Sequence, residues 1–351
     1  MVSSPQQHVH GAAHTAGGRR VGGGSTPQTT KYGRTSPELD ALVASALARC
    51  GMTIQRCRGR VVRPSRFRPV FQYTVSCLAD GAREQGRLVV IGKGYYREDG
   101  ARAFDCMRQL WKDGFGEDSP LAIPQPLAYI ADAGLLLQAR ASGRPLYLYL
   151  DDPAAATGPV RLTARWLAKL HAAGPIGAPV LAHAYEMEKV GTYCRVLADL
   201  FPQYQQRVRA LGEAVLARLA IVRDGRPRPT HGDFQPKNIF VRRRGVTVID
   251  FDRFALAHPA RDLGHFVGQS STMCYVRTGS FDAIKPWNAA FLDEYVARGS
   301  ALALVGLPTF VARTFLEVLY YKLFVRPVKD PSFLPVWLTE AEAWLERGAG
   351  L

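Results

Sequence analysis

Two short apolar runs on either side of a charged turn most constrain the fold of this chain, because the half of the sequence around them otherwise has helical patterns. The first run, NIFV, covers residues 238–241, and the second, VTVI, covers residues 246–249, with RRRG between them. Such runs joined by a short turn that contains glycine predict an antiparallel hairpin. Asp233 and Asn238 precede the second run, and Asp250 directly follows it. We therefore expect the oxygen atoms of the three side chains to converge at one edge of the hairpin.

Each of these three polar residues also has an ordinary structural explanation. Asp and Asn are common in turns and at helix caps, where their side chains bond to nearby backbone N–H groups. For any one of them alone, that explanation is the simpler one. The three together, at this spacing, favour a shared chemical site.

Phosphoryl transfer is the chemistry that best fits two carboxylates and one carboxamide. The reaction needs an attacking hydroxyl aligned with a terminal phosphate, and charge neutralised on the phosphate oxygens. Magnesium, which prefers hard oxygen ligands, serves the second need, and Asn238 and Asp250 are suitable ligands. A further carboxylate must lie beside the acceptor hydroxyl, and Asp233 is the candidate.

Length and composition indicate the class of protein. With 351 residues and 47% hydrophobic side chains, the chain is long enough for two lobes with a sizeable core. Apolar runs such as residues 302–312 are shorter than the ~20 residues of a membrane helix, and no secretory signal is recognisable, so no membrane partner is expected. The six cysteines have long, irregular spacings, which predicts neither zinc nor disulfides and favours a cytoplasmic protein.

The formal net charge of +15 raises the question of a nucleic-acid partner. Much of the excess is arginine spread along the whole chain, without a basic helix or a stripe of interleaved aromatic residues. This distribution argues against nucleic acid. We interpret the charge as favouring solubility, with a local role in binding a phosphorylated ligand.

Three regions of the chain differ in pattern. Residues 1–35 are rich in Gly, Ser, Thr, Gln and His, which predicts a disordered tail. Residues 36–143 mix strand and helix patterns and predict a small α+β lobe. Residues 144–351 are mostly amphipathic and predict a larger helical lobe, in which the hairpin at 238–249 provides the only strand-like segments.

The small lobe has local signals for each expected element. Ser36 and Pro37 indicate the start of a first helix, as N-cap and first helical residue. We then expect, in order, an antiparallel hairpin within 53–96, a helix over 100–115 and two strands around 132–134.

The polar motifs together resemble the active-site signature of the aminoglycoside phosphotransferase and choline kinase-like enzymes, small-molecule relatives of the protein kinases. That family has a loop H-G-D-x-x-x-x-N and a strand end I-D-[FW]-[DE], matched here by HGDFQPKN at 231–238 and IDFD at 249–252. The resemblance extends over about 54–347. It implies a two-lobed, α+β protein kinase-like fold, with a nucleotide-binding N-terminal lobe and a catalytic and substrate-binding C-terminal lobe.

The resemblance also implies a role for each residue of these motifs. Asp233 would be the catalytic base that orients the acceptor hydroxyl, while Asn238 and Asp250 would bind magnesium and, with it, ATP. His231 would be a packed, hydrogen-bonded residue that supports the loop. For Asp252, two alternatives are open: it supports the magnesium site, or it is simply exposed to solvent.

Two further segments resemble supporting parts of the family's site. WLAKLHAAG contains His171, which would support the core near the catalytic loop. HPARDLGHF contains Asp262, which would brace that loop through backbone hydrogen bonds, although a helix-cap role is a close alternative.

The nucleotide side has fewer signals. Lys93, the only lysine between Lys31 and Lys112, is the candidate for contacting the nucleotide phosphates. Its expected partner is a carboxylate on the following helix, with Asp105 as first candidate and Glu98 as second.

Two stretches flank the expected nucleotide site. Residues 63–73 carry three arginines and no glycine at the place where protein kinases have a glycine-rich loop. Arginine side chains can contact phosphates directly, but we interpret this stretch as a solvated basic edge. The adenine-binding hinge is expected near Gln138 to Arg140.

These expectations describe an ATP- and magnesium-dependent kinase that phosphorylates a hydroxyl of a small molecule of aminoglycoside, sugar or amino alcohol type. A non-catalytic, kinase-like nucleotide-binding or scaffolding module is the alternative. The acceptor itself is left open by the sequence. Asp282, Asp293 and Glu294 are carboxylates that suit a cationic acceptor, but their orientation cannot be inferred from the sequence.

Overall fold

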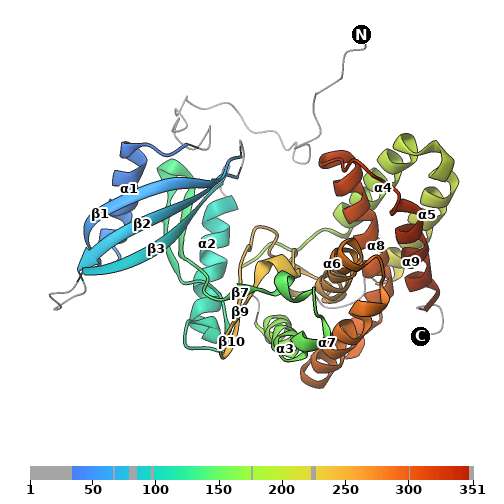
Figure 1. Cartoon of the computed structure of the whole chain (residues 1–351). Coiled ribbons are helices and arrows are strands. Elements are labelled where there is room, and N and C mark those ends of the chain that lie inside the picture. Colours follow the sequence, from blue (N-terminus) through green and yellow to red (C-terminus); the bar gives the residue numbers. More distant parts are fainter. Residues whose placement is uncertain are drawn as a thin grey trace, which may run out of the picture.

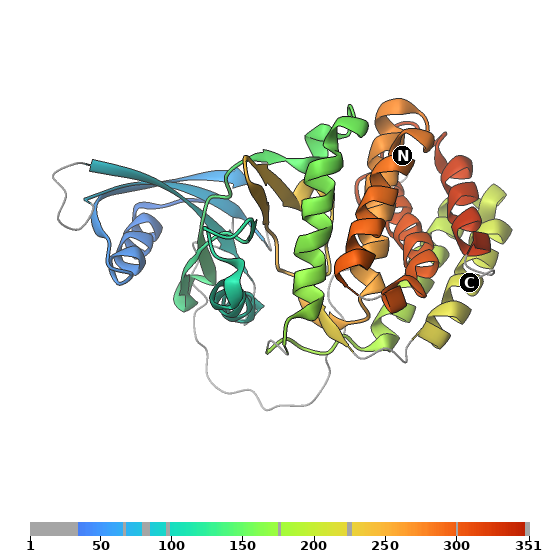
Figure 2. The same ribbon diagram turned by 90° about the horizontal axis from the view of Figure 1, so that it is seen from below.

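The chain forms two lobes, one built on a β-sheet and a larger one built from helices (Figure 1). The computed structural model describes residues 34–65, 68–78, 85–95, 99–174, 177–222, 227–299 and 301–347. The lobe built on the sheet is formed by the N-terminal part of these residues. The division into two lobes is also visible after a turn of 90° (Figure 2). We expected a disordered tail over residues 1–35. Residues 1–33 of this stretch lie outside the described residues.

Helix α1 (Pro37–Ala48) begins where the sequence indicated. The Ser36 hydroxyl accepts a hydrogen bond from Leu39 N at 3.2 Å, and Pro37 is the first helical residue. Leu39 and Val43 on its apolar face pack against the sheet, in a core separate from that of the helical lobe.

Five antiparallel strands form the sheet of the N-terminal lobe, in the order β1-β2-β3-β6-β5. Their bounds are Thr53–Arg63 (β1), Val70–Leu78 (β2), Gln85–Gly94 (β3), Pro126–Ile130 (β5) and Leu135–Ala139 (β6). The expected hairpin is β2–β3, with Val70 opposite Lys93, and the two strands expected around residues 132–134 are β5 and β6. Both expectations are confirmed, and β1 is an additional strand.

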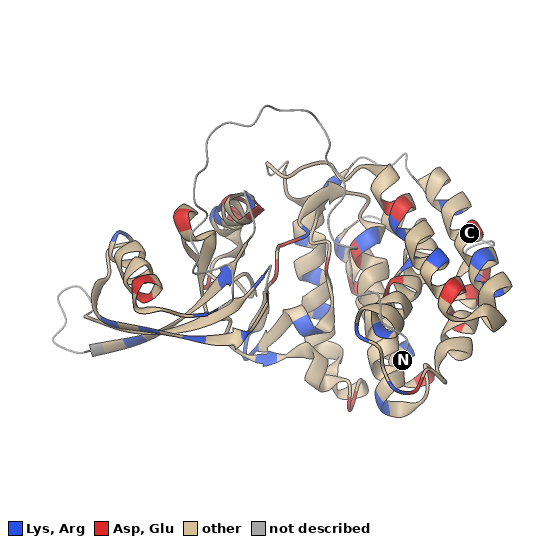
Figure 3. Cartoon of the chain, turned by 90° about the horizontal axis from the view of Figure 1, so that it is seen from above, with Lys and Arg blue, Asp and Glu red and all other residues tan. Residues whose placement is uncertain are grey.

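Strand β1 forms one edge of this sheet and carries an arginine at every second position of its middle part. Arg56, Arg58 and Arg60 are exposed and, because side chains alternate along a strand, they share one face. Figure 3 shows basic positions along the strands of this lobe. Arg87 of β3 lies on the same face, opposite Ser76 of β2.

Helix α2 (Asp99–Leu110) follows strand β3 and is the helix expected over 100–115. Its regular α-helical part is shorter than expected, because the backbone kinks within Trp111–Phe115, where Gly114 adopts a positive φ of 85°. Met107 and Leu110 are buried in the main core.

A second sheet, with the order β4-β10-β9-β7, joins the two lobes. Its strands are Leu121–Ala122 (β4), Arg144–Pro145 (β7), Ile239–Arg242 (β9) and Gly245–Val248 (β10). The hairpin β9–β10 is the predicted one, and β4 from the N-terminal part of the chain pairs with β10 in parallel. The hairpin that carries the polar motifs is therefore attached to both lobes.

The prediction that this hairpin provides the only strand-like segments after residue 143 is wrong. Strand β7 joins the second sheet, and a third sheet pairs β8 (Arg228–Thr230) with β11 (Ala255–Ala257). These three strands have only two or three residues each, which is too short for an alternating pattern to be recognised.

Seven α-helices fill the described part of the C-terminal lobe. They are α3 (Thr157–Ala172), α4 (His183–Leu200), α5 (Gln205–Val222), α6 (Ala260–Thr278), α7 (Lys285–Arg298), α8 (Leu307–Tyr320) and α9 (Leu334–Arg347). Helix α6 is buried on nearly all sides and packs most extensively against α8.

Two glycines allow α6 and α8 to approach closely. A Cβ atom on Gly264 would lie 2.5 Å from Phe310 Cβ and 2.6 Å from the Phe310 carbonyl carbon. One on Gly268 would lie 2.7 Å from the Thr314 side chain. Glycine is therefore required at these positions by the distance between the helices, and this packing fixes α6 beside the polar loop at 231–238.

No helix in the described ranges combines the length and the apolarity that a bilayer crossing requires. The six cysteines are all free thiols.

Substitution of Gly264 by Ala tests the close packing of α6 on α8. The added methyl group meets backbone atoms of α8, so we expect the free energy of unfolding to fall by about 1–3 kcal/mol in urea denaturation. Gly191→Ala is the matched control, because Gly191 also lies within a helix but has open space around it. That control is expected to gain about 0.5–1 kcal/mol from helix propensity. Equal effects of the two substitutions would contradict the packing argument.

Candidate active site

A polar loop, residues 231–238, connects strand β8 to strand β9 and carries most of the candidate residues. His231 at its start is fully buried, and burial lowers the pKa of its imidazole. Its Nδ1 accepts a hydrogen bond from Asp233 N at 3.2 Å, so its Nε2 is protonated and donates to Ile249 O at 3.0 Å. Neutral His231 thus links the polar loop to the strand end that precedes Asp250.

Asp262, in the first turn of α6, holds the start of the polar loop. Its carboxylate is 0% exposed and accepts hydrogen bonds from His231 N at 2.6 Å and Gly232 N at 2.8 Å. A third contact comes from His171 Nε2 at 3.2 Å, and His171 Nδ1 lies 2.8 Å from Tyr295 Oη. Burial would raise the pKa of Asp262, but the bond from His171 and the surrounding positive charges keep it lowered.

Gly232 is needed for the path of the loop. Its φ is +80°, and a Cβ atom there would lie 2.2 Å from Arg253 O. Both the left-handed backbone and the lack of space exclude a side chain at this position.

The Asp233 carboxylate receives three side-chain donors. Its Oδ1 accepts from Gln235 Nε2 at 2.8 Å and from His265 Nε2 at 3.0 Å, and its Oδ2 accepts from Asn238 Nδ2 at 3.0 Å. Burial acts to raise its pKa, but the bond and charge of His265, together with the charge of Arg253, lower the pKa to about 2. The side chain is still 22% exposed, so a ligand can reach it.

Asn238 and Asp250 lie on either side of the hairpin base. Asn238 Nδ2 also donates to Asp233 O at 3.0 Å, which fixes the orientation of its carboxamide. Ile249 N donates to Asn238 O at 2.9 Å and so places Asp250 directly after this link. Asp250 has a φ of 77°, the only positive φ of a non-glycine residue in the described ranges. Such backbone strain is typical of functional sites.

Lys93 connects the two lobes at this point. Its Nζ lies 2.5 Å from Asp250 Oδ1 and 2.6 Å from Asp252 Oδ1, and the lysine side chain is only 11% exposed. Asp252 also accepts hydrogen bonds from Tyr95 Oη and from Arg68 Nη1, the latter at 2.5 Å. Burial would raise the pKa of Asp252, but the charges of Lys93 and Arg68 lower it.

Several nucleotide-side expectations differ from what the structure shows. Asp105 is exposed on α2, and Lys93 pairs instead with two carboxylates of the C-terminal lobe. The second candidate, Glu98, lies outside the described residues. Within residues 63–73, which we interpreted as a solvated basic edge, Arg68 is ion-paired with Asp252 Oδ2 at 2.5 Å, and its side chain is 39% exposed. Arg63 is exposed as expected.

The structure places Gln138 on the sheet face of Lys93. Gln138 on β6 pairs with Ile91 on β3, two residues from Lys93, and strand alternation gives the three side chains a common face. The strand ends at Ala139, where the chain leaves the sheet.

Sequence reasoning missed His265, which lies between two carboxylates. Its Nε2 faces Asp233 at 3.0 Å, and its Nδ1 faces Glu317 Oε2 at 3.5 Å. The available signal was its spacing, three residues after Asp262, which puts both side chains on the same face of α6. Finding Glu317 would have required knowing how α8 packs.

Glu317 belongs to a series of ion pairs behind the loop, all of them buried except on the side of Arg253, which is 52% exposed. It binds Arg253 Nη1 at 2.9 Å and also Arg313, whose Nε lies 2.9 Å from Glu186 Oε2. Glu186 in turn binds Arg261 Nε at 2.8 Å.

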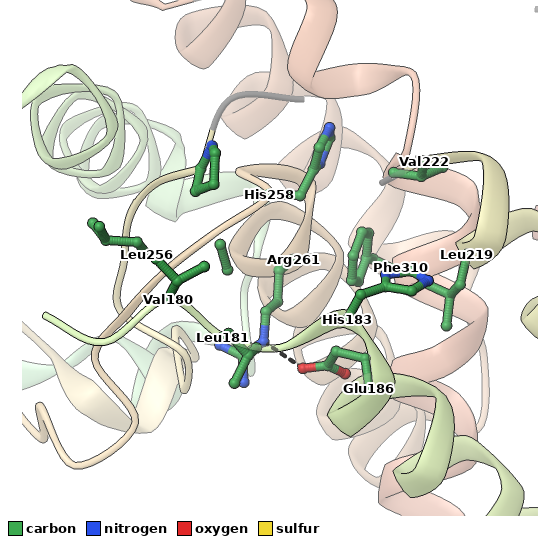
Figure 4. A pocket seen from close by; sticks show the side chains of 12 residues that line it. Val180, Leu181, His183, Glu186, Leu219, Val222, Leu256, His258, Arg261 and Phe310 are labelled. Carbon is green, nitrogen blue, oxygen red and sulfur yellow. Dashed lines mark hydrogen bonds and ion pairs between the residues drawn. The ribbon is translucent and has the colours of Figure 1, made fainter. Parts of the chain in front are cut away.

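The Arg261–Glu186 pair lines a small, mainly apolar cavity between α4, β11, α6 and α8 (Figure 4). Leu219, Val222 and Phe310 form part of its wall. None of the side chains bonded to Asp233 lines this cavity, so we assign it no part in the site.

The chain matches one family model over most of its length. The model is described as the phosphotransferase enzyme family and covers residues 84–304. Among curated proteins, no sequence matches significantly.

Several solved structures share the fold at low identity. A choline/ethanolamine kinase family protein from Mesorhizobium loti has a TM-score of 0.54 at 17% identity, covering 78% of this chain and 85% of that one. The amicoumacin kinase hAmiN, in complex with AMP-PNP, Ca²⁺ and Ami, has a TM-score of 0.56 at 15% identity, covering 90% and 91%. The aminoglycoside phosphotransferase APH(2'')-Ib, ADP-bound, has a TM-score of 0.50 at 16% identity, covering 87% and 97%. The expected resemblance and the two-lobed α+β fold are thereby confirmed.

The low pKa of Asp233 predicts a specific dependence of stability on pH. Its folded-state pKa of about 2 lies below the reference value of 3.8, so the stabilisation is present above pH 3.8 and is lost as pH falls towards 2. Between about pH 6 and about pH 3, the wild type is expected to lose about 1 kcal/mol more unfolding free energy than Asp233→Asn. Urea denaturation of both proteins at both pH values measures the difference. Equal losses of unfolding free energy in the two proteins would contradict the prediction.

Proposed function

The chain belongs to the phosphotransferase enzyme family, and on that premise we propose that it is a kinase that transfers the γ-phosphate of ATP to a hydroxyl group of a small molecule. We assign nucleotide binding to residues 36–143 and the catalytic and acceptor-binding groups to residues 144–351. The observation that carries the proposal is the Asp233 carboxylate, which is held by three donors yet is accessible to a ligand.

Asp233 suits the role of orienting the acceptor hydroxyl. Each carboxylate oxygen accepts two hydrogen bonds, and the three side-chain donors leave capacity for one more. A pKa of about 2 makes Asp233 a weak base, so it aligns the hydroxyl and receives its proton only late in the transfer. In the reaction, the bond between the γ-phosphorus and its bridging oxygen breaks as the hydroxyl oxygen bonds to phosphorus.

Lys93 and Arg68 provide positive charge for the phosphates. At the junction of the lobes, Asp250 and Asp252 hold Lys93, and Asp252 also holds Arg68. Arginine contacts phosphate through two parallel N–H groups, which compensates for the absence of glycine in residues 63–73. Gln138, on the same sheet face as Lys93, marks the side on which we place the nucleotide base.

Asn238 and Asp250 have the donor atoms that magnesium requires. The carboxamide nitrogen of Asn238 is engaged by Asp233, which leaves its oxygen branch for a cation, and Asp250 adds a carboxylate. A bound magnesium ion would neutralise charge on the phosphate oxygens. The described residues contain no cluster of three or more His, Cys, Asp or Glu suited to a metal, which agrees with a shell completed by phosphates and water.

The similar structures support nucleotide binding at the level of the fold. APH(2'')-Ib is ADP-bound, and hAmiN is in complex with AMP-PNP and Ca²⁺. The free thiols of this chain suit a reducing compartment such as the cytoplasm.

Replacing Asp233 by Ala tests the proposed reaction. With ATP, magnesium and a panel of alcohols, we expect phosphate transfer to fall about 10²–10⁴-fold, because the hydroxyl is no longer aligned and has no proton acceptor. Asp132→Ala is the control, since Asp132 is an exposed carboxylate in the other lobe. Turnover unchanged in Asp233→Ala would remove Asp233 from the mechanism. Thermal stabilisation by ATP without any transfer would favour the non-catalytic module instead.

His265 is a positioning residue for Asp233. His265→Leu removes the donor to Asp233, and we expect kcat to fall about 10–100-fold, the equivalent of one hydrogen bond to a charged group. His265→Gln keeps an N–H donor and is expected to recover most of that loss. Steady-state kinetics and thermal unfolding of both variants distinguish positioning of Asp233 from a purely structural role of His265. A purely structural His265 would give equal kcat losses that follow the melting temperature.

A further inference from the structure

Three cationic side chains gather around Tyr147, next to the polar loop. Lys237 Nζ lies 5.2 Å from the centre of the Tyr147 ring, and Arg277 Cζ lies 4.2 Å from it. Lys322 lies close enough for the charge of Lys237 to affect its titration. We refer to Tyr147, Lys237, Arg277 and Lys322 as the Tyr147 cluster.

The Tyr147 cluster combines segments that are far apart in the sequence. Tyr147 belongs to the 3-10 helix Leu146–Tyr149, Arg277 to the last turn of α6, and Lys322 to the π-helical turn after α8. Lys237 belongs to the polar loop itself and is exposed. It directly precedes Asn238, whose side chain is bonded to Asp233, so one member of the cluster belongs to the same loop as the proposed reaction centre.

The electrostatics of the cluster are positive. Burial, followed by the charge of Lys237, lowers the pKa of Lys322, and a hydrogen bond from Arg277 lowers the pKa of the Tyr147 phenol. Among the described residues, the carboxylate paired with the cluster is Asp151, which lies 2.6 Å from Arg277 Nη1 and is 72% exposed. An ion pair so open to water offsets little of the positive charge.

Two of the three acidic residues that would suit a cationic acceptor, Glu294 and Asp282, are engaged in ion pairs elsewhere. Glu294 receives Arg165 at 2.6 Å, Arg298 at 3.3 Å and Arg161 at 3.4 Å. Asp282 pairs with Lys285 at 2.5 Å, and Asp293 is exposed on α7. None of these three carboxylates contributes to the Tyr147 cluster.

We propose that the acceptor carries an anionic group, a carboxylate or a phosphate, and that the Tyr147 cluster binds this group while Asp233 orients the acceptor hydroxyl. This inference rests on the proposed kinase function and names its substrate class. The planar guanidinium of Arg277 suits two-point binding of either anion, and the two lysines add charge that is not tied to one geometry. The anionic group is unchanged by the reaction, in which only the hydroxyl oxygen gains the phosphoryl group.

A series of three-carbon probes tests the charge of the acceptor. Glycerol, glycerate, glycerol 3-phosphate and 3-amino-1,2-propanediol share a diol and differ in charge. With ATP and magnesium, we expect kcat/KM for the two anions to exceed that for the neutral and cationic probes by about ten-fold or more, since charged hydrogen bonds are made only with anions. The ratio of kcat/KM for glycerate to kcat/KM for glycerol 3-phosphate shows whether the site prefers a carboxylate or a phosphate. Equal values across the series, or a preference for the cation, would overturn the proposal.

Substitutions in the cluster test where the anion binds. Lys237→Gln is expected to raise KM for the preferred anion about ten-fold while kcat changes little, because Asp233 is untouched. The matched control is Lys189→Gln, since Lys189 Nζ also lies 5.2 Å from a tyrosine ring, that of Tyr185 on α4. Equal KM values in wild type and Lys237→Gln would contradict the assignment.

Calorimetric titration of the same four probes into the full-length protein separates this proposal from the kinase function. Binding of the anions to wild type, weakened in Lys237→Gln and retained in Lys189→Gln, supports the anion site even if no phosphate is transferred. Absence of anion binding to wild type overturns the site even if another alcohol is phosphorylated. Transfer that is insensitive to Asp233→Ala would instead refute the reaction assigned to Asp233.

Discussion

The Asp262 carboxylate is the constraint on which the rest of the site depends. A fully buried charge is stable only when hydrogen bonds replace the water that it has lost, and here two backbone N–H groups and His171 do so. The two backbone donors belong to His231 and Gly232, so satisfying this charge also fixes the start of the polar loop. The orientation of Asp233 follows from that position, because its own N–H is bonded to His231.

Behind the loop, alternating charges extend the same principle through the helical lobe. Asp233 contacts His265, His265 faces Glu317, and Glu317 binds two arginines. Each buried charge in this series has an opposite neighbour, which is the condition under which such groups are tolerated in a core. The glycines that let α6 approach α8 bring His265 and Glu317 within reach of one another. The packing of two helices and the electrostatics of the candidate catalytic carboxylate are therefore linked.

The sequence predicted those parts of the fold that have a local pattern. The start of α1 at Ser36, the hairpin β9–β10 and the hairpin β2–β3 each combine a periodic run with a recognisable boundary residue. The partners of Lys93 could not be predicted, because Asp250 lies 157 residues away and in the other lobe. Likewise, the short strands β7, β8 and β11 exist only because longer neighbours pair with them. Local patterns thus predicted which residues carry the chemistry, and long-range packing determined what they touch.

The arginines of β1 have a consequence beyond the individual molecule. Within the described residues, β1 pairs with β2 alone, so its other side is a sheet edge of the kind to which a strand from another copy can add. Arg56, Arg58 and Arg60 place positive charge along that border, and a second copy would bring the same charges against it. Mutual repulsion thus disfavours self-association at the position where aggregation would most readily begin.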